Sequence, residues 1–252
     1  MARPFLSVII PAYNEAQRIP LTLVDLDHHL AAVEFSYEII VVDDNSTDKT
    51  PAVVTQFGEM IKNLRLERNP GKLGYGNTIA AGMRAAHGEW RLTMDADNSI
   101  SIQEFVKAIP YLRLTNGFEV LLASRVEKGS RFDPPLPTER RIAEWLLNRF
   151  IRLAMKSRLR DTLLGFRCFS SGVAERVFGA VKIEQWGGVI EGVLLAERLG
   201  YPVKEIPVSI AHVRGSHFLM RDYLQIAWGA VKIRWWLNRG KYNINQQPTT
   251  HN

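Results

Sequence analysis

Three short strand-like runs, each followed at once by polar residues, place the strongest constraint on the fold. The first two, Phe5–Ile10 and Tyr37–Val42, are largely apolar, which is typical of strands buried on both faces of a parallel sheet. The third, Glu89–Thr93, is shorter and more mixed, and leads into Met94-Asp95-Ala96-Asp97-Asn98. Because parallel strands end at one edge of a sheet, the three polar clusters are expected to meet where open α/β sheets bind ligands.

Helical patterns separate these strands. Leucines recur at helical spacing before Ala32 and predict a helix there. A weaker strand, Asn63–Arg68, precedes a glycine-rich turn and a further helix that extends to about Ala86. The alternation of strands and helices with short loops predicts an α/β fold with a mostly parallel sheet.

Length and composition limit the class of protein. The 252 residues suit one large α/β domain or a domain with an appendage, and the hydrophobic fraction of 46% is ordinary for a folded protein. Cys168 is the only cysteine in the sequence, which excludes an internal disulfide and fits a reducing compartment. We expect no signal segment after Met1 and no membrane span, because no sufficiently long apolar run occurs.

Asp95 and Asp97 are the first candidate site. One small residue separates them, so both carboxylates can point to one place on a turning backbone. Paired oxygen ligands suit Mg²⁺ or Mn²⁺, which keep positions open for phosphate oxygens. An isolated Asp-x-Asp sequence is more often a solvated turn, so the metal hypothesis depends on the segments upstream.

Two upstream segments bring further polar groups to the same edge. Residues 43–48, which read Asp-Asp-Asn-Ser-Thr-Asp, can cap the next helix, and we expect Asp48 to have only that role. Residues 69–77 form a glycine-rich turn that lacks the residue order of a Walker loop.

Four motifs then occur in one order at suitable separations: residues 8–15 (Val-Ile-Ile-Pro-Ala-Tyr-Asn-Glu), residues 41–48 (Val-Val-Asp-Asp-Asn-Ser-Thr-Asp), Gly71-Lys72 with Gly74, and Asp95-Ala96-Asp97. Each motif is weak alone. The ordered set resembles the inverting family 2 glycosyltransferases over the first hundred residues. That resemblance implies the GT-A fold, a three-layer αβα arrangement that binds a nucleotide-diphosphate sugar.

The second half is similar to the polyprenyl-phosphate sugar synthases, which include dolichyl-phosphate mannose and dolichyl-phosphate glucose synthases. The matching segments are Ala123–Arg125, Asp161–Phe169, Trp186 with Glu191, and Val203–Val208. The Asp-Thr-x-x-Gly-Phe-Arg sequence is slightly closer to the glucose branch. Asn98 and His217 depart from the usual pattern, so the donor, UDP-glucose or GDP-mannose, stays open.

The resemblance implies roles for residues of the first half. Asp95 and Asp97 would hold Mg²⁺ or Mn²⁺ on the diphosphate, where the metal offsets charge on the leaving group. Six residues would bind the donor: Pro11, Tyr13, Glu15, Asp43, Asp44 and Lys72. Glu15 would lie near the ribose and Asp43 near the base or ribose, with helix capping the alternative for Asp43 and Asp44.

A polyprenyl phosphate acceptor is already anionic at neutral pH, so it needs a cationic clamp more than a strong general base. Four arginines are candidates for that clamp, because guanidinium matches phosphate: Arg125, Arg131, Arg167 and Arg214. A surface or structural role is the alternative for each of them. We expect Asp161 to orient Arg167, with a role as base the alternative. Glu191 would hold an arginine of the clamp, or be an ordinary helix charge. The expected catalytic set is Asp97, Arg125, Arg167 and Asp161.

Positive charge gathers in two late segments. The chain carries a net +6, residues 125–160 carry +6 and residues 214–241 carry +5, so the remainder is negative. A helix expected over residues 139–160 has an apolar stripe with a basic rim, and Phe218–Tyr242 interleaves tryptophans with Lys and Arg. Such segments favour an anionic membrane surface, although a helix packed on a sheet has the same pattern.

We therefore expect a GT-A domain over residues 1–215, a membrane-apposed helix over residues 216–242 and a flexible tail over residues 243–252. The domain would include the amphipathic segment 139–160. The enzyme would be peripheral on the cytoplasmic face of a membrane, where nucleotide sugars are made.

Four other interpretations fit the sequence less well. A family 2 transferase with another acceptor shares the first half but predicts a true catalytic base. A sugar nucleotidyltransferase would place a glycine-rich, arginine-containing loop where Pro11–Glu15 stands. A non-enzymatic scaffold would be indicated by loss of the aspartate pair, which is present. Nucleic-acid binding is suggested only by the pI of about 9.5, without any supporting motif.

Overall fold

A seven-stranded sheet forms the centre of the computed structural model, which describes residues 3–114, 117–211 and 220–242. The strand order is β3-β2-β1-β4-β7-β5-β8. The bounds are β1 Leu6–Ala12, β2 Tyr37–Asp43, β3 Leu64–Arg68, β4 Trp90–Thr93, β5 Val120–Ala123, β7 Arg167–Ser170 and β8 Val203–Ile206. The four strands expected from the sequence are therefore present to within two residues at each end, and β1 runs through Pro11 instead of ending before it.

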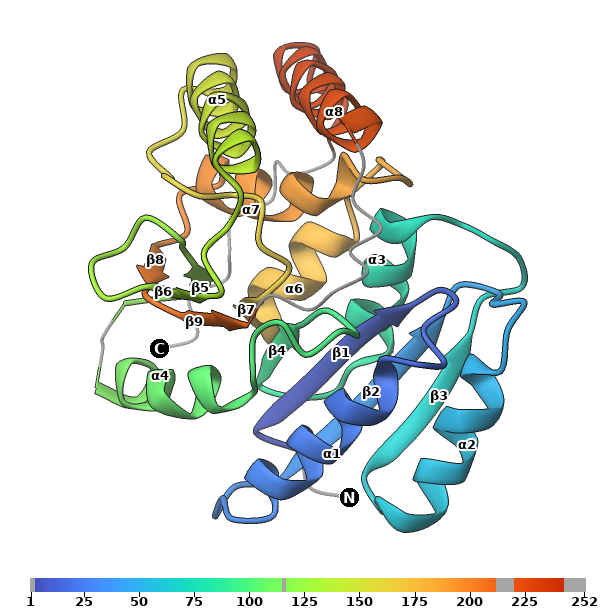
Figure 1. Cartoon of the computed structure of the whole chain (residues 1–252). Coiled ribbons are helices and arrows are strands. Elements are labelled where there is room, and N and C mark those ends of the chain that lie inside the picture. The colour runs from blue at the N-terminus through green and yellow to red at the C-terminus, as the bar shows by residue number, and fades with distance from the viewer. Residues whose placement is uncertain (1–2, 115–116, 212–219, 243–252) are drawn as a thin grey trace.

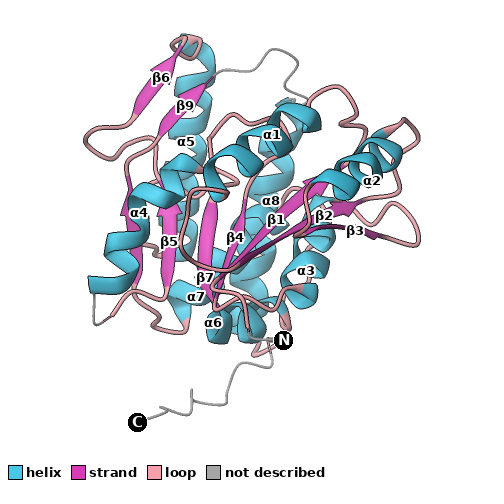
Figure 2. Ribbon diagram, turned by 90° about the horizontal axis from the view of Figure 1, so that it is seen from below, coloured by secondary structure: helices cyan, strands magenta, loops and turns pink. Residues whose placement is uncertain are grey.

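Helices cover both faces of this sheet (Figures 1 and 2). One face packs against α1 Ile19–Leu30, α2 Thr50–Met60 and α4 Gln103–Leu114. The other packs against α3 Tyr75–Ala85, α6 Ser171–Phe178 and α7 Gly188–Arg198, with α5 Thr138–Met155 and α8 Met220–Asn238 beyond α7. The fold is the expected α/β arrangement of three layers.

Strand β1 shows why the sheet is buried on both sides. Val8 and Ile10 face the core under α1, whereas Ile9 faces the core under α3, and all three are fully buried. Strands β1, β2, β3 and β4 are mutually parallel. Strand β7 runs antiparallel between β4 and β5, so the sheet is mostly, not wholly, parallel.

A small second sheet lies at one end of the main one. Its strands β6 Arg131–Asp133 and β9 Ser209–Ala211 pair in parallel. These strands place Phe132 and Ile210 beside the cleft described below.

The helix expected over residues 139–160 ends earlier than predicted. Lys156 adopts a left-handed conformation (φ 54°, ψ 37°) and stops α5 at Met155. After it, the N–H of Arg158 donates to Glu197 and that of Arg160 to Glu205, so this segment leaves the helix to reach α7 and β8. Lys156 and Arg160 therefore do not belong to the basic rim of a continuous helix.

The C-terminal helix α8 shares the core of the domain. Ile226, Ala230 and Ile233 are buried against α7 and the rest of the core, whereas the opposite side of the helix is exposed. The predicted helix start at residues 216–219 and the predicted tail at residues 243–252 lie outside the described residues. Across the helices that the structure describes, none is sufficiently long and apolar to span a bilayer.

Helix α3 approaches the sheet closely because Gly82 has no side chain. A Cβ at this position would lie 2.4 Å from Ile9 Cγ2 and 2.9 Å from Val42 Cγ2. We expect Gly82→Ala to destabilise the fold by about 1–3 kcal/mol, because the added methyl overpacks the core. Thermal and denaturant unfolding measure the change.

Gly172→Ala is the matched control, because Gly172 also lies in a helix but a Cβ there meets nothing within 4 Å. It should be neutral or stabilising by up to about 1 kcal/mol, from helix propensity alone. Equal stability of the two variants would contradict the close packing of α3.

Candidate active site

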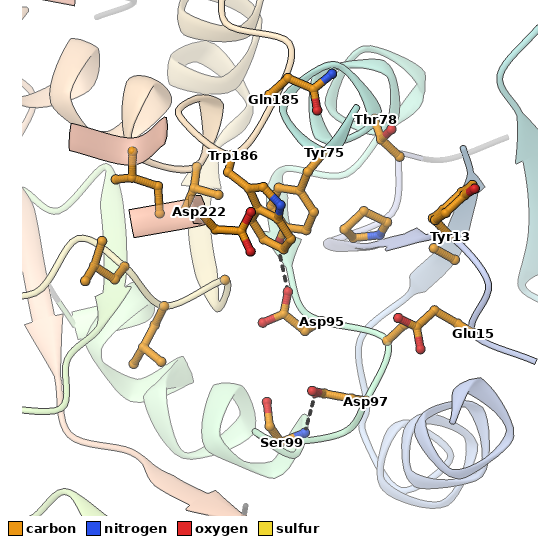
Figure 3. A pocket seen from close by; sticks show the side chains of 18 of the residues that line it. Tyr13, Glu15, Tyr75, Thr78, Asp95, Asp97, Ser99, Gln185, Trp186 and Asp222 are labelled. Carbon is orange, nitrogen blue, oxygen red and sulfur yellow. Dashed lines mark hydrogen bonds between the residues drawn. The ribbon is translucent and has the colours of Figure 1, made fainter. Parts of the chain in front are cut away.

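A cleft with a volume of about 710 Å³ opens at the carboxyl ends of β1 and β4. Its walls come from the loops after these strands, the first turn of α3, the segment before α7, and the starts of α5 and α8. Figure 3 shows Asp95 and Asp97 on one side of this cleft, with Tyr75 and Trp186 above Asp95 and with Tyr13 and Glu15 on the side of β1.

Asp95 is held tightly at the end of β4. The hydroxyl of Tyr75 donates to its Oδ1 over 2.7 Å. A Cβ at Gly165 would lie 2.5 Å from both of its carboxylate oxygens, so a side chain there would displace the carboxylate. Enclosure by the protein, and next the charge of Asp97, raise the pKa of Asp95 to about 6. Burial and the charge of Asp95 raise the pKa of Tyr75, so its hydroxyl stays protonated and remains a donor.

Asp97 is placed by a reversal of the chain. Asn98 adopts a left-handed conformation (φ 54°), which asparagine tolerates better than most residues. The N–H of Ser99 donates to Asp97 Oδ1 over 3.0 Å, and Arg18 Nη1 lies 3.8 Å from Asp97 Oδ2. Both aspartates line the cleft, as the sequence predicted for a pair on one turn.

Asp44 shapes the glycine-rich turn. Its carboxylate accepts the side-chain N–H of Asn69 and the backbone N–H groups of Leu73 and Gly74, at 2.8–2.9 Å. Asp43 is fully buried beneath it and pairs with Arg68 over 3.1 Å. Asp44 lines the cleft, whereas Asp43 lies behind the wall.

The residues expected to bind the nucleoside lie together on one side of the cleft. Tyr13, Glu15 and Lys72 all line it, together with Pro11. The ammonium of Lys72 lies 3.5 Å from the centroid of the Tyr13 ring, a cation–π contact. Glu15 accepts a hydrogen bond from Arg18 Nε over 2.6 Å.

Tyr75 and Trp186 form an aromatic pair that the sequence did not identify as part of the site. Their rings stack with centroids 4.6 Å apart and an interplanar angle of 18°. In the sequence, Trp186 stood out only through its spacing from Glu191. Tyr75 was only a residue of the glycine-rich turn, next to Gly74. No local pattern signals a contact between residues so far apart in the chain.

Arg125 and Asp161 form a bidentate ion pair, which corrects the expectation that Asp161 orients Arg167. Nε and Nη2 of Arg125 donate to the two carboxylate oxygens of Asp161, over 2.7 and 2.9 Å. Glu144 from α5 pairs with the remaining nitrogen of Arg125, and Arg140 pairs with Glu144. Burial opposes the charge of Arg125, but the two carboxylates outweigh it and raise its pKa.

Arg167 lies behind the cleft instead of in it. Its guanidinium donates to the carbonyl oxygens of Thr162 and Leu164, each over 2.7 Å, and burial lowers its pKa to about 10. These bonds hold the loop that presses Gly165 against Asp95. Contrary to the expectation of a phosphate ligand, the structure gives Arg167 backbone partners.

The other predicted site residues do not gather at the cleft. Arg131 is exposed on β6 and is not among the residues that line the cleft, and Arg214 lies outside the described residues. Glu191 is fully buried and accepts hydrogen bonds from two backbone N–H groups and from Tyr242, and no arginine within the described ranges is among its partners. Arg140, which the sequence did not single out, does line the cleft.

The chain is a glycosyltransferase and belongs to glycosyl transferase family 2, whose sequence profile matches residues 7–177. Dolichyl-phosphate beta-glucosyltransferase ALG5A of Trichomonas vaginalis is 29% identical over 98% of this chain and 78% of its own length. The dolichyl-phosphate beta-glucosyltransferase of Dictyostelium discoideum is 31% identical over 91% of this chain and 74% of its own length.

Solved structures share the fold at low sequence identity. Mannosyl-3-phosphoglycerate synthase from Rubrobacter xylanophilus superposes with a TM-score of 0.67 at 14% identity, over 98% of this chain and 79% of that one. Glucosyl-3-phosphoglycerate synthase from Mycobacterium tuberculosis, in complex with Mn²⁺, UDP and glucosyl-3-phosphoglycerate, gives 0.68 at 18% identity, over 92% of this chain and 80% of that one. The fold is therefore that of the GT-A glycosyltransferases.

The raised pKa of Asp95 predicts a pH-dependent stability. The folded-state pKa lies above the usual 3.8, so the stability that protonation confers is lost as the pH rises through about 6. In the presence of EDTA, we expect Asp95→Asn to raise the free energy of unfolding more at pH 7.5 than at pH 5.0, by a difference of up to about 2 kcal/mol, measured by denaturant unfolding.

Asp48→Asn is the control. Burial opposes the charge of Asp48, but hydrogen bonds from Thr50 outweigh it and lower its pKa, so Asp48 is ionised at both pH values. Its substitution should have the same effect at pH 5.0 and 7.5. An equal gain in stability for Asp95→Asn at the two pH values would contradict the raised pKa of Asp95.

Proposed function

We propose that this enzyme transfers glucose from UDP-glucose to a polyprenyl phosphate at a membrane surface, with inversion at the anomeric carbon. The observation that carries the proposal is the position of the aspartate pair. Asp95 and Asp97 line a cleft whose wall includes α5 and α8, and these same helices expose apolar side chains on their outer side. The dolichyl-phosphate glucosyltransferases among the relatives favour glucose over mannose.

Asp95 and Asp97 suit a divalent metal. Burial and the charge of Asp97 raise the pKa of Asp95, so the ionised pair is unfavourable without a counter-ion. Bound Mg²⁺ or Mn²⁺ would offset this repulsion, and carboxylate oxygens are ligands that both ions accept. The described residues hold no group of three or more His, Cys, Asp or Glu arranged for a metal, so the diphosphate and water would complete the ligands. When bound, the metal supplies positive charge to the leaving nucleoside diphosphate.

The donor would lie along the edge formed by β1, the glycine-rich turn and the Asp95–Asp97 turn. Tyr13 and Glu15 are in place for the nucleoside. The contact of Lys72 with the Tyr13 ring puts an ammonium group beside them, where it can meet phosphate oxygens. Asp44 contributes by fixing the backbone of the turn, because its oxygens are taken by that backbone.

The acceptor phosphate would enter from the side of α5. Arg140 and Arg125 line this wall, and Glu144 joins them. A phosphate oxygen would form the new bond to the anomeric carbon as the bond from that carbon to the diphosphate breaks on the opposite side. Because the acceptor oxygen carries no proton at neutral pH, the transfer needs no general base, which agrees with the use of Asp161 as the partner of Arg125.

The membrane would contact the α5–α8 apolar face, which we define by the exposed residues Ile142, Trp145, Leu146, Phe150 and Leu153 of α5 and Leu224, Trp228, Val231 and Trp235 of α8. The two helices lie side by side at one end of the molecule (Figure 1). Trp145 and Trp228 are 62% and 58% exposed, and Arg149 is an exposed cation among them. Exposed tryptophans beside basic residues are typical of interfacial helices. We place this face on the cytoplasmic side of the membrane, where nucleotide sugars are made.

Transfer assays test the proposed reaction. Labelled UDP-glucose and GDP-mannose are supplied separately with a short polyprenyl phosphate and Mg²⁺ or Mn²⁺. We expect an organic-phase product from UDP-glucose, because the motifs and the relatives both favour that donor. Product from GDP-mannose alone would assign mannose instead, and nucleotide binding without any lipid product would indicate another acceptor.

Asp97→Ala should abolish this turnover without loss of the fold, because it removes one of the two proposed metal ligands. Asp27→Ala on the exposed side of α1 is the control and should be fully active. Circular dichroism and melting temperature monitor the fold of both variants. Retained activity in Asp97→Ala would remove the metal role of that residue.

Liposome binding tests the α5–α8 apolar face. We expect the double variant Trp145→Ser/Trp228→Ser to cosediment about tenfold more weakly with vesicles that contain anionic lipid, because two exposed apolar side chains no longer enter the interface. The control is Leu21→Ser/Val24→Ser, which removes two comparably exposed side chains from α1. Equal binding of the two double variants would assign the α5–α8 face to another partner.

A further inference from the structure

Residues 181–187, which we call the 181–187 loop, form the second part of the connection between α6 and α7 and carry Gln185 and Trp186 into the cleft. The loop presses on the first turn of α3. A Cβ at Gly74 would lie 2.7 Å from the carbonyl oxygen of Glu184, and a Cβ at Gly76 would lie 2.2 Å from that of Ile183. The position of this loop therefore determines how Trp186 meets Tyr75, the residue between the two glycines.

The end of the same loop contacts α8. A Cβ at Gly229 would lie 2.8 Å from the Cα of Gly187, so the two backbones touch. The loop is thus enclosed between α3, which carries Tyr75, and α8, which carries part of the proposed membrane face.

Glu191 fixes the start of this loop from below. Its carboxylate accepts the backbone N–H groups of Lys182 and Ile183, at 3.0 and 2.8 Å, and the hydroxyl of Tyr242 at 2.6 Å. The side chain is fully buried and is not among the residues that line the cleft. A buried carboxylate needs such donors, so Glu191 and the loop backbone satisfy one another.

Tyr242 belongs to the chain that follows α8. It is 3% exposed, and its ring packs at a right angle to Trp236 with centroids 6.0 Å apart. Its hydroxyl therefore ties the segment after α8 to the carboxylate that holds the 181–187 loop.

We propose that Glu191 and Tyr242 are positioning residues for the donor site: together they hold the 181–187 loop against α3, and so keep Trp186 stacked on Tyr75 and the Tyr75 hydroxyl on Asp95. The contacts form one series, from Tyr242 to Glu191, to the loop, to the aromatic pair and to Asp95. This inference rests on the proposed function in that Asp95 acts on the donor. It explains the Trp186–Glu191 spacing without a substrate contact for Glu191.

Amide hydrogen exchange tests the first part of this proposal. Tyr242→Phe removes only the hydroxyl, and Glu191→Gln keeps the shape but weakens the acceptor. In both variants we expect faster exchange at the amides of Lys182, Ile183 and Asn77, the last of which donates to Glu184. The control is Tyr201→Phe, a tyrosine that packs on the same core beside β8. Exchange unchanged from wild type in Tyr242→Phe would overturn the proposal.

Calorimetry with UDP and Mn²⁺, without acceptor, tests the consequence for the site. We expect Tyr242→Phe and Glu191→Gln to weaken UDP binding about tenfold, as for residues that support a metal ligand through a neighbour. In the transfer assay the KM for the nucleotide sugar should rise while that for polyprenyl phosphate stays unchanged, and Tyr201→Phe should match wild type. Equal rises in both KM values would indicate general loosening and would overturn the positioning role.

The two proposals fail in different ways. If wild-type protein binds no UDP and forms no lipid product, the proposed function fails, whereas hydrogen exchange still decides whether Glu191 and Tyr242 hold the loop. If Glu191→Gln does not fold, Tyr242→Phe alone decides the question. Faster loop exchange with wild-type UDP affinity would overturn the link to the donor site.

Discussion

The enclosure of Asp95 is the constraint on which the rest of the site depends. A carboxylate at the carboxyl end of a central strand loses much of its hydration, and its neighbour Asp97 adds a like charge. The surrounding structure is arranged to permit this. Gly165 leaves room for the carboxylate, Tyr75 donates to it, and Arg167 holds the loop that carries Gly165. Several residues distant in sequence thus have their roles defined by one carboxyl group.

The arginine network on the other side of the cleft follows a related principle. Arg125 is largely buried and is neutralised by Asp161 and Glu144. Such a network is costly to break, because removing one partner leaves an uncompensated buried charge. Its members come from the loop after β5, from α5 and from the loop before β7, so the network also fixes α5 at the cleft.

The sequence was sufficient for the fold and for the polar residues that follow β1 and β4 at one edge of the sheet. Buried strands have a strong pattern, and polar residues after such strands must share one edge, so the Asp95–Asp97 pair and the Tyr13–Glu15 segment could be placed. The partners of the charged side chains could not be predicted from the sequence. Asp161 pairs with Arg125 instead of Arg167, and Glu191 accepts from Tyr242. These side chains come from segments far apart in the chain, and no local pattern predicts which of them will meet.

Helices α5 and α8 line the cleft on one side and expose apolar side chains on the other. If the outer side rests on a bilayer, the enzyme and its lipid substrate diffuse in two dimensions. The reaction rate then depends on the mole fraction of the acceptor among the lipids and not on its concentration in the bulk volume. Diluting the acceptor with inert lipid would slow the reaction at constant total amount, whereas the water-soluble donor would keep ordinary bulk behaviour. The rate law of this enzyme would therefore contain the surface density of the acceptor and the bulk concentration of the donor, although both substrates meet in one cleft.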